Sequence, residues 1–242
     1  MYVLLKKEIA SFLSSLIAYI AMVVFLLVLG LFVWVFPETS VLDYGFANMD
    51  SFFYTAPWIF LFLIPAITMR SFSEENKTGT IELLVTKPIT ELQIVLGKYF
   101  AGVCLAIFTL VPTIVYYYSL YQLGSTTGNI DSAAVLGSYI GLIFLAASLV
   151  AIGIFTSAIS DNQIVAFILA VFISFICYTG FESFSQLDLF GPIDQTIAEM
   201  GINAHYQSMS RGVIDSRDAL YFISFISIFI LFTKLVLEKR KW

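Results

Sequence analysis

The chain has 242 residues, of which 60% are hydrophobic and only 12% are charged, and its mean hydropathy is +0.93. Soluble domains are roughly half apolar, so this composition excludes an ordinary soluble domain and indicates a protein embedded in a membrane. The formal net charge of −5 comes mainly from acidic loops, and we expect no nucleic-acid partner.

Six apolar segments are long enough to cross a bilayer, which takes about 20 helical residues. Their interiors carry no Asp, Glu, Arg or Lys, and only Glu182 and Lys234 lie near their ends. Proton relays and ion-coupled carriers place ionisable groups at membrane depth, so the pattern argues against them. The sequence predicts an all-α protein with one membrane domain over residues 1–242. Its spans lie near 14–36, 52–69, 99–122, 133–159, 163–182 and 219–237.

The positions of the basic residues predict the orientation, because Lys and Arg accumulate in cytoplasmic loops. Ten of the twelve fall on one face of the six-span arrangement, and only Arg211 and Arg217 fall on the other. Both termini are therefore expected in the cytoplasm. The ten are Lys6, Lys7, Arg70, Lys77, Lys87, Lys98, Lys234, Lys239, Arg240 and Lys241.

The N-terminal residues 1–13 precede the first apolar run. Leu5, Ile9 and Phe12 share one helical face, which predicts an interfacial helix over Tyr2 to Leu13. The alternative is an early start of the first span. A cleaved signal peptide is excluded because the apolar run from Leu16 to Phe36 is longer than its usual apolar core.

The segment from residue 70 to 98 is a polar stretch with four basic and four acidic residues, so it is locally neutral rather than a basic patch. Ser71 with Glu74, and Thr90 with Gln93, each fit the S/T-x-x-E/Q capping box that starts a helix. The second box opens directly into the third span.

Between these boxes, residues 80–87 predict a short amphipathic helix, bounded by Gly79 and Pro88. Ile81, Leu84 and Val85 share one face, and Glu82 lies on another. A helix of about two turns is marginal in water, so it must lie against the membrane, the bundle or another protein. A loop resting on the lipid headgroups is the other interpretation.

Several residues within the spans indicate packing rather than chemistry. Ala133, Gly137 and Gly141 form a small face that allows close helix approach, either within the chain or in a dimer. Cys104 and Cys177 are expected to be packing residues, and no metal-binding cluster is apparent. Three prolines, Pro57, Pro65 and Pro112, are expected to bend their spans.

The stretch from residue 183 to 218, on the outer side, carries apolar residues and a second short-helix signal. Pro192 at its start, Asp194 in its first turn and Gly201 after its end predict a helix. We expect this segment to lie on or in the outer leaflet, either as a gate or as an ordered lid. His205 is expected to make a hydrogen bond in a loop.

Residues 74–90, EENKTGTIELLVTKPIT, and 95–98, VLGK, resemble the cytoplasmic loop of ABC-2 type transporter permeases. Four further stretches resemble the gliding-motility-associated ABC transporter permease of bacteria. They are YQLGSTTGNID at 121–131, GSYIG at 137–141, SDNQIVAF at 160–167 and HYQSMSRGVIDSRD at 205–218.

The resemblance implies a six-span permease in the bacterial inner membrane whose loop, as a coupling helix, docks on a separate ATP-binding subunit. That subunit would hold ATP and magnesium, and this chain would bind no cofactor. A second copy, or a second gliding-associated membrane subunit, would complete the membrane unit. The residues expected to contact the ATPase are Glu74, Glu75, Thr78, Gly79, Thr80, Ile81, Glu82, Leu83, Leu84, Lys87 and Pro88.

The chain itself lacks a nucleotide-binding P-loop. In the nearest match, Gly97-Lys98 is followed by Tyr99 rather than by Ser or Thr, and Leu92 stands where the first glycine is required. Two other classes stay open: a polytopic membrane enzyme, for which no activated nucleophile is visible at membrane depth, and an ATP-independent carrier. ATP-driven mechanical work and export need the same coupling loop, so the sequence does not separate them.

Overall fold

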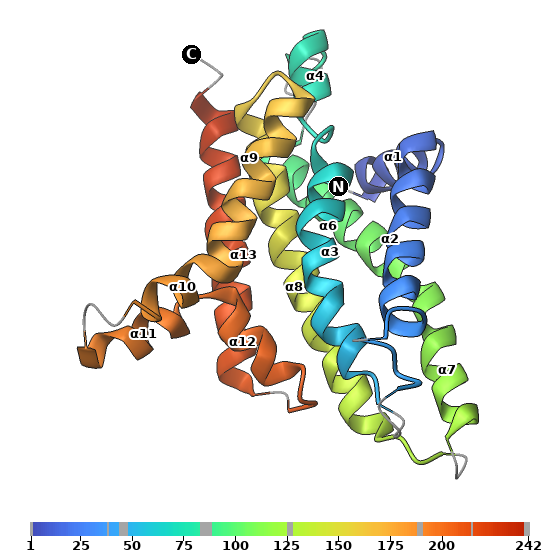
Figure 1. Cartoon of the computed structure of the whole chain (residues 1–242). Helices are drawn as coiled ribbons and strands as arrows, with labels where there is room; N and C mark the ends of the chain where they lie inside the picture. The colour runs from blue at the N-terminus through green and yellow to red at the C-terminus, as the bar shows by residue number, and fades with distance from the viewer. Residues whose placement is uncertain are drawn as a thin grey trace.

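The computed structural model describes residues 2–37, 39–43, 48–82, 89–124, 128–187, 191–213 and 215–239, and within these ranges every regular element is helical (Figure 1). The elements are α1 Tyr2–Leu13, α2 Leu16–Trp34, α3 Asp50–Thr68, α4 Ser73–Thr78, α6 Glu91–Leu110, η1 Val111–Thr113, α7 Ile114–Leu123, α8 Ser132–Ile159, α9 Gln163–Phe175, the π-helical turn η2 Ile176–Gly180, α10 Phe181–Ser185, η3 Gly191–Ile193, α11 Asp194–Glu199, α12 Ile202–Met209 and α13 Ser216–Lys239.

Five helical stretches in the described residues are long and apolar enough to cross a membrane, where six spans were predicted. The remaining prediction, 14–36, corresponds to α2, which forms a bent pair with α1 at an angle of 68°; the count is six if this pair is one span. The five are Asp50–Thr78, Glu91–Leu123, Ser132–Ile159, Gln163–Ser185 and Ser216–Lys239.

Helix α8 runs through the middle of the bundle and packs against α3, α6, α9 and α13 (Figure 1). Leu142, Leu145, Leu149 and Ile152 on this helix are fully buried. Close approach to α3 depends on Gly153, because a Cβ atom there would lie only 1.9 Å from Thr68 Oγ1. Of the apolar window in this span, 78% is buried within the chain.

The spans containing α9 and α13 are much less covered, with 22% and 17% of their apolar windows buried. Ile168 and Phe172 of α9 and Leu231 of α13 are among the large apolar side chains that stay exposed. Apolar surface of this extent is stable only against lipid or another chain. These two helices therefore form the side of the bundle that a partner or the bilayer must cover.

The small face of α8 packs against the chain itself rather than lying free. A Cβ atom at Gly137 would lie 2.8 Å from Gly212 O, and one at Gly141 would lie 2.8 Å from Met209 Cβ. The predicted third member, Ala133, is exposed; its neighbour Ala134 contacts Gly212 instead. The face starts one residue later than expected because these contacts come from α12 and the turn after it.

Local helix signals gave one correct and one wrong prediction in the segment 70–98. The box at Thr90 forms: its side chain accepts from Gln93 N at 3.3 Å, and Gln93 Oε1 accepts from Thr90 N at 3.2 Å. The box at Ser71 does not form, because α4 begins at Ser73 after Phe72 and has no side-chain cap from within the segment.

Helix α6 begins at Glu91 and runs unbroken from its capping box into the third predicted span, as expected. One expectation about the spans is corrected. Cys104 is exposed on the bundle surface rather than packed, whereas Cys177 is partly buried. Of the prolines, Pro57 and Pro65 lie inside the continuous helix α3, and Pro112 lies in the 3₁₀ turn between α6 and α7.

The stretch that follows α9 holds more helix than predicted. The predicted short helix corresponds to η3 and α11 and ends before Gly201. Helix α12 was missed, because its sequence INAHYQSM carries no long apolar run. Helices α10 and α11 project sideways from the bundle, whereas α12 packs back against α8 and α13 (Figure 1).

Gly153→Ala tests the close contact between α8 and α3. The added methyl group must displace Thr68, and overpacking of this kind costs about 1 to 3 kcal/mol. We expect a clearly lower midpoint of thermal unfolding in detergent. Gly30→Ala is the control, because its methyl group would lie 3.1 Å from its nearest neighbour, Tyr116 OH, rather than 1.9 Å. Equal midpoints for the two variants would contradict this packing.

Candidate functional site

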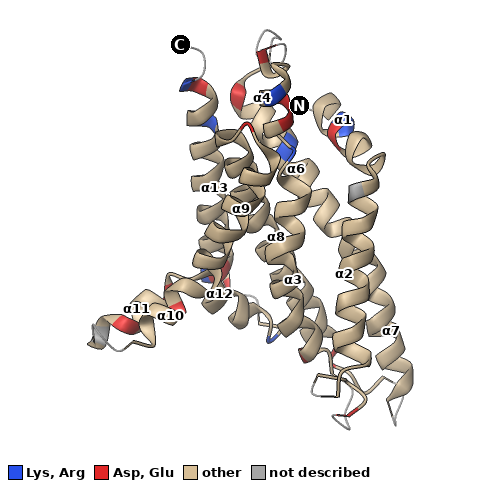
Figure 2. Ribbon diagram, turned by 45° about the horizontal axis from the view of Figure 1, so that its top comes forward, with Lys and Arg blue, Asp and Glu red and all other residues tan. Residues whose placement is uncertain are grey.

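One end of the bundle, which we call the basic end, carries α1, α4, the start of α6 and the C-terminal part of α13 (Figure 2). Its centre is Lys98, whose side chain is only 1% exposed although it is charged. Lys98 Nζ lies 3.2 Å from Glu8 Oε1 on α1 and 3.0 Å from Glu75 Oε2 on α4. A buried charge is tolerated only when it is paired, so this ammonium group ties three helices together.

Further contacts complete the surroundings of this ammonium group. Lys98 Nζ donates a hydrogen bond to Ser71 O and lies 4.9 Å from the centre of the Phe72 ring. Lys7, on the outer side, is 3.6 Å from Glu75 Oε1 and 3.7 Å from Glu8 Oε1. We call Lys7, Glu8, Glu75 and Lys98 the Lys98 cluster.

Helix α4 is also fixed to α8, through Ser157 and Asn76. Ser157 Oγ accepts hydrogen bonds from the Phe72 and Ser73 amides at 2.9 and 3.1 Å, and it donates to Met69 O at 2.9 Å. Asn76 Nδ2 donates to Ala158 O at 3.4 Å and to Ser160 O at 3.5 Å. A helix of six residues is too short to be stable alone, so these contacts hold it in place.

The residues predicted to contact an ATPase do not all face outwards. Glu74 is exposed in the first turn of α4, and Thr78, Gly79, Thr80 and Glu82 are exposed at the tip of the basic end. Glu75 instead turns inwards to the Lys98 cluster, and Ile81 packs partly buried against the core. Leu83, Leu84, Lys87 and Pro88 lie outside the described residues, and most of the predicted 80–87 helix lies there with them.

The tip begins where α4 ends. Gly79 has φ +70° and ψ +7°, a left-handed conformation that ends the helix and that glycine adopts without strain. Ile81 and Glu82 are helical again. The chain therefore presents a short exposed turn directly after a helix that is fixed to the membrane spans.

Sequence reasoning missed Lys98 as the centre of this end. It was counted as one of the loop charges, whereas it lies inside α6 and is buried. The sequence did contain a sign that Lys98 lies in a helix, because it stands in the apolar segment that follows the Thr90 capping box. Within that helix it is the one cation between Ile94 and Leu110.

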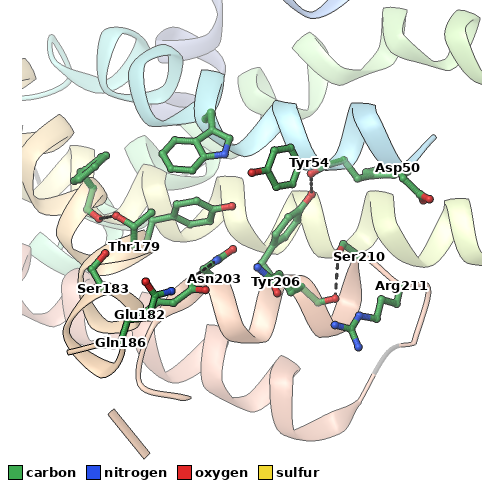
Figure 3. Close-up of a pocket in the computed structure, with 15 residues that line it drawn as sticks. Asp50, Tyr54, Thr179, Glu182, Ser183, Gln186, Asn203, Tyr206, Ser210 and Arg211 are labelled. Carbon is green, nitrogen blue, oxygen red and sulfur yellow. Dashed lines mark hydrogen bonds between the residues drawn. The ribbon is translucent and has the colours of Figure 1, made fainter. Parts of the chain in front are cut away.

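At the other end, α3, the η2–α10 region and α12 enclose a cavity of about 750 Å³ (Figure 3). Tyr206 OH donates to Phe53 O at 2.6 Å, and burial raises the pKa of Tyr206, so the hydroxyl keeps its proton as a donor. Asn203 Nδ2 donates to Glu182 Oε2 at 2.6 Å. The lining residues are Asp50, Phe53, Tyr54, Trp58, Phe175, Tyr178, Thr179, Glu182, Ser183, Gln186, Asn203, Tyr206, Gln207, Ser210 and Arg211.

His205 makes hydrogen bonds, as expected, but from helix α12 rather than from a loop. Its Nδ1 lies 2.7 Å from Asp218 Oδ1, its Nε2 lies 2.9 Å from Glu199 O, and its ring stacks on Tyr221 at 3.8 Å. These partners bind α12 to the ends of α11 and α13. Among the described residues, no three His, Cys, Asp or Glu side chains are grouped closely enough to hold a metal ion.

The fold and these two regions define the class of protein. It is an all-helical membrane bundle with an exposed, anchored turn at one end and a large cavity at the other. Residues 4–177, which are 174 of the 242, match the model of the family described as ABC-2 family transporter protein. The chain belongs to this family and is a multi-pass membrane protein. No curated protein matches it.

Lys98→Met tests the role of the Lys98 cluster. The substitution removes the cation but leaves Glu8 and Glu75 partly buried, and breaking a buried pair in this way costs about 3 to 5 kcal/mol. We expect a large drop in the unfolding midpoint and faster proteolysis between α1 and α2.

The control is Lys234→Met, which removes an exposed pair with Glu238, and such pairs are worth about 0.3 to 0.5 kcal/mol. Adding Glu8→Gln and Glu75→Gln to Lys98→Met should restore part of the stability, because no unpaired carboxylate then remains. If Lys98→Met is as stable as Lys234→Met, the cluster does not hold the three helices together.

Proposed function

We propose that the chain is the permease subunit of an ATP-binding cassette transporter, and that a separate ATPase docks on α4 and residues 78–88. The observation that supports this proposal is the anchoring of α4. Its amides are held by Ser157 of α8, and its Glu75 is held by Lys98 of α6. A force that reaches α4 through the exposed turn after Gly79 would therefore pass to α6 and α8 through these contacts.

The basic end would face the cytoplasm of a bacterium. Arg70, Lys77 and Lys98 lie there, together with the lysines of α1 and the C-terminal part of α13 (Figure 2). Because basic residues accumulate on the cytoplasmic side, both termini would lie in the cytoplasm, and the membrane would be the inner one. The large cavity would open on the outer side.

The ATP and magnesium would be held entirely by the partner. Lys98 follows Gly97 in the nearest likeness to a P-loop, and in the structure its ammonium group is buried against two carboxylates. A phosphate-binding lysine must reach its ligand, and this one does not. The hydrolysis of ATP would therefore take place in the docked subunit.

A second membrane subunit would cover the exposed faces of α9 and α13, either a second copy or a gliding-associated partner. Helix α9 also contributes Phe175 to the wall of the 750 Å³ cavity, so a subunit placed there would close the cavity's side. The mixture of aromatic and polar side chains in the cavity suits an amphipathic cargo that leaves on the outer side.

Within the family, we assign the chain to bacterial gliding machinery on the four stretches at 121–131, 137–141, 160–167 and 205–218. Three of these stretches surround the α8–α12 contact, where Gly137 and Gly141 meet Gly212 and Met209. In that machinery, the movement of the bundle would serve export or mechanical work.

Glu82→Arg tests the docking surface. Glu82 is exposed beside the anchored α4, so reversing its charge should weaken ATPase binding without disturbing the fold. The measurement is affinity purification of the tagged chain from native membranes in mild detergent, with mass spectrometry of the retained proteins. We expect the wild type to retain a subunit with a Walker motif and Glu82→Arg to retain about tenfold less, a change of about 1.4 kcal/mol.

Asp43→Arg is the matched control, because it makes the same charge change at an exposed site between α2 and α3. It should retain the ATPase as the wild type does. Normal retention by Glu82→Arg would contradict the docking surface. Failure of the wild type to retain any ATPase in several mild detergents would contradict the permease function itself and favour a carrier or a membrane enzyme.

A further inference from the structure

A second, smaller cavity of about 220 Å³ lies at the basic end. It is formed by α1, the start of α2, the end of α3 and α4, and it adjoins the Lys98 cluster. Its volume is below the roughly 300 Å³ at which pockets for drug-sized ligands begin, so it suits a small polar group. The lining residues are Lys7, Glu8, Ser11, Phe12, Ser15, Ala66, Ile67, Arg70, Ser71, Glu74, Glu75 and Lys98.

The charges that line this cavity fall into two sets. Lys7, Glu8, Glu75 and Lys98 form ion pairs with one another within 4.0 Å. Arg70 and Glu74 form no ion pair with any described residue, and the buried Nε of Arg70 has no hydrogen-bond acceptor there. A buried guanidinium N–H without an acceptor is costly. The cavity thus offers one cation and one carboxylate to a ligand from outside.

The place of the cavity indicates where that ligand comes from. Ser15 lines it and is the N-cap residue of α2, yet its side chain makes no capping bond. Arg70 lies just after the end of α3, in the last part of the candidate span Asp50–Thr78. The cavity therefore lies where spans leave the apolar layer, at the depth of lipid headgroups. Helix α1, which lines the cavity, also carries the exposed apolar side chains of Tyr2 and Val3.

We propose that this cavity binds the headgroup of a zwitterionic aminophospholipid, such as phosphatidylethanolamine, with its phosphate on Arg70 and its ammonium group on Glu74. A guanidinium group pairs with phosphate oxygens through its planar set of donors. A primary ammonium group gives the carboxylate N–H donors that a quaternary choline lacks. An anionic headgroup would leave Glu74 unpaired and place negative charges side by side.

The test is lipid retention measured by native mass spectrometry. The purified, delipidated chain is mixed with detergent micelles that hold equal amounts of phosphatidylethanolamine, phosphatidylcholine and phosphatidylglycerol. We expect phosphatidylethanolamine to be retained about tenfold over each of the others, as one charged hydrogen bond allows. Equal retention of the three lipids, or preference for phosphatidylglycerol, would overturn the proposal.

Variants of Arg70 and Glu74 test which part of the headgroup each side chain binds. Arg70→Gln should lower retention of phosphatidylethanolamine and phosphatidylcholine alike, whereas Glu74→Gln should abolish only the preference between them. Lys77→Gln is the control, since Lys77 is exposed on the same helix and does not line the cavity. Each variant must elute and unfold like the wild type. An unchanged preference in both variants would place the lipid elsewhere and overturn the assignment.

Soluble competitors separate the headgroup from a free anion. Millimolar phosphoethanolamine should displace the lipid, and inorganic phosphate at the same concentration should not. Displacement by inorganic phosphate alone would show an anion site and contradict the lipid assignment. The readout needs no ATPase, so the result is independent of the proposed function.

Discussion

The burial of one ammonium group constrains the whole basic end of this protein. Moving the Lys98 charge out of water is costly, and the cost is offset only while Glu8 and Glu75 stay within about 3 Å. The first carboxylate belongs to α1 and the second to α4, so neither helix can move away from α6 without exposing or unpairing a charge. The three helices therefore behave as one unit.

The other contacts of this end act in the same direction. Ser157 joins the start of α4 to α8, the most buried helix of the bundle. At the opposite end, α12 is held to α3 by the hydrogen bond from Tyr206 to Phe53 O, and it packs against the small face of α8. Helix α12 also forms one side of the 750 Å³ cavity. Helix α8 thus contacts both α4, which precedes the exposed turn, and α12, which lines the cavity. A displacement of α4 can therefore be transmitted to α12 along helix α8.

The parts of this arrangement that follow from the sequence are those with local causes. Long apolar runs predicted the spans, and the Thr90–Gln93 box predicted the start of α6, because both depend on residues within a few positions of each other. The Ser71–Glu74 box failed because the amides of Phe72 and Ser73 bind Ser157, 85 and 84 residues away. No local pattern carries that information.

The same reason explains the errors at the site. In the sequence, Lys98 stands at the end of a charged segment and was counted as a loop lysine. Only the docking of α1 and α4 shows that it is buried. Glu74 and Glu75 were both predicted to contact an ATPase. The sequence does not distinguish the two, and only the docking of α4 shows that Glu75 faces Lys98. The 750 Å³ cavity joins residues from Asp50 to Arg211, so its polar wall exists only after the bundle has assembled.

The most direct measurement of the central claim is the distance between α1 and α4 during ATP turnover. Spin labels would replace Val3 and Lys77, both exposed, with a third at Leu220 on α13 and with Cys104 and Cys177 changed to alanine. In the complex with the proposed ATPase, trapped with ATP and vanadate, the distance between labels 3 and 77 should stay unchanged while both labels shift relative to the label at 220. A change in the 3–77 distance, with α1 fixed relative to α13, would contradict the account.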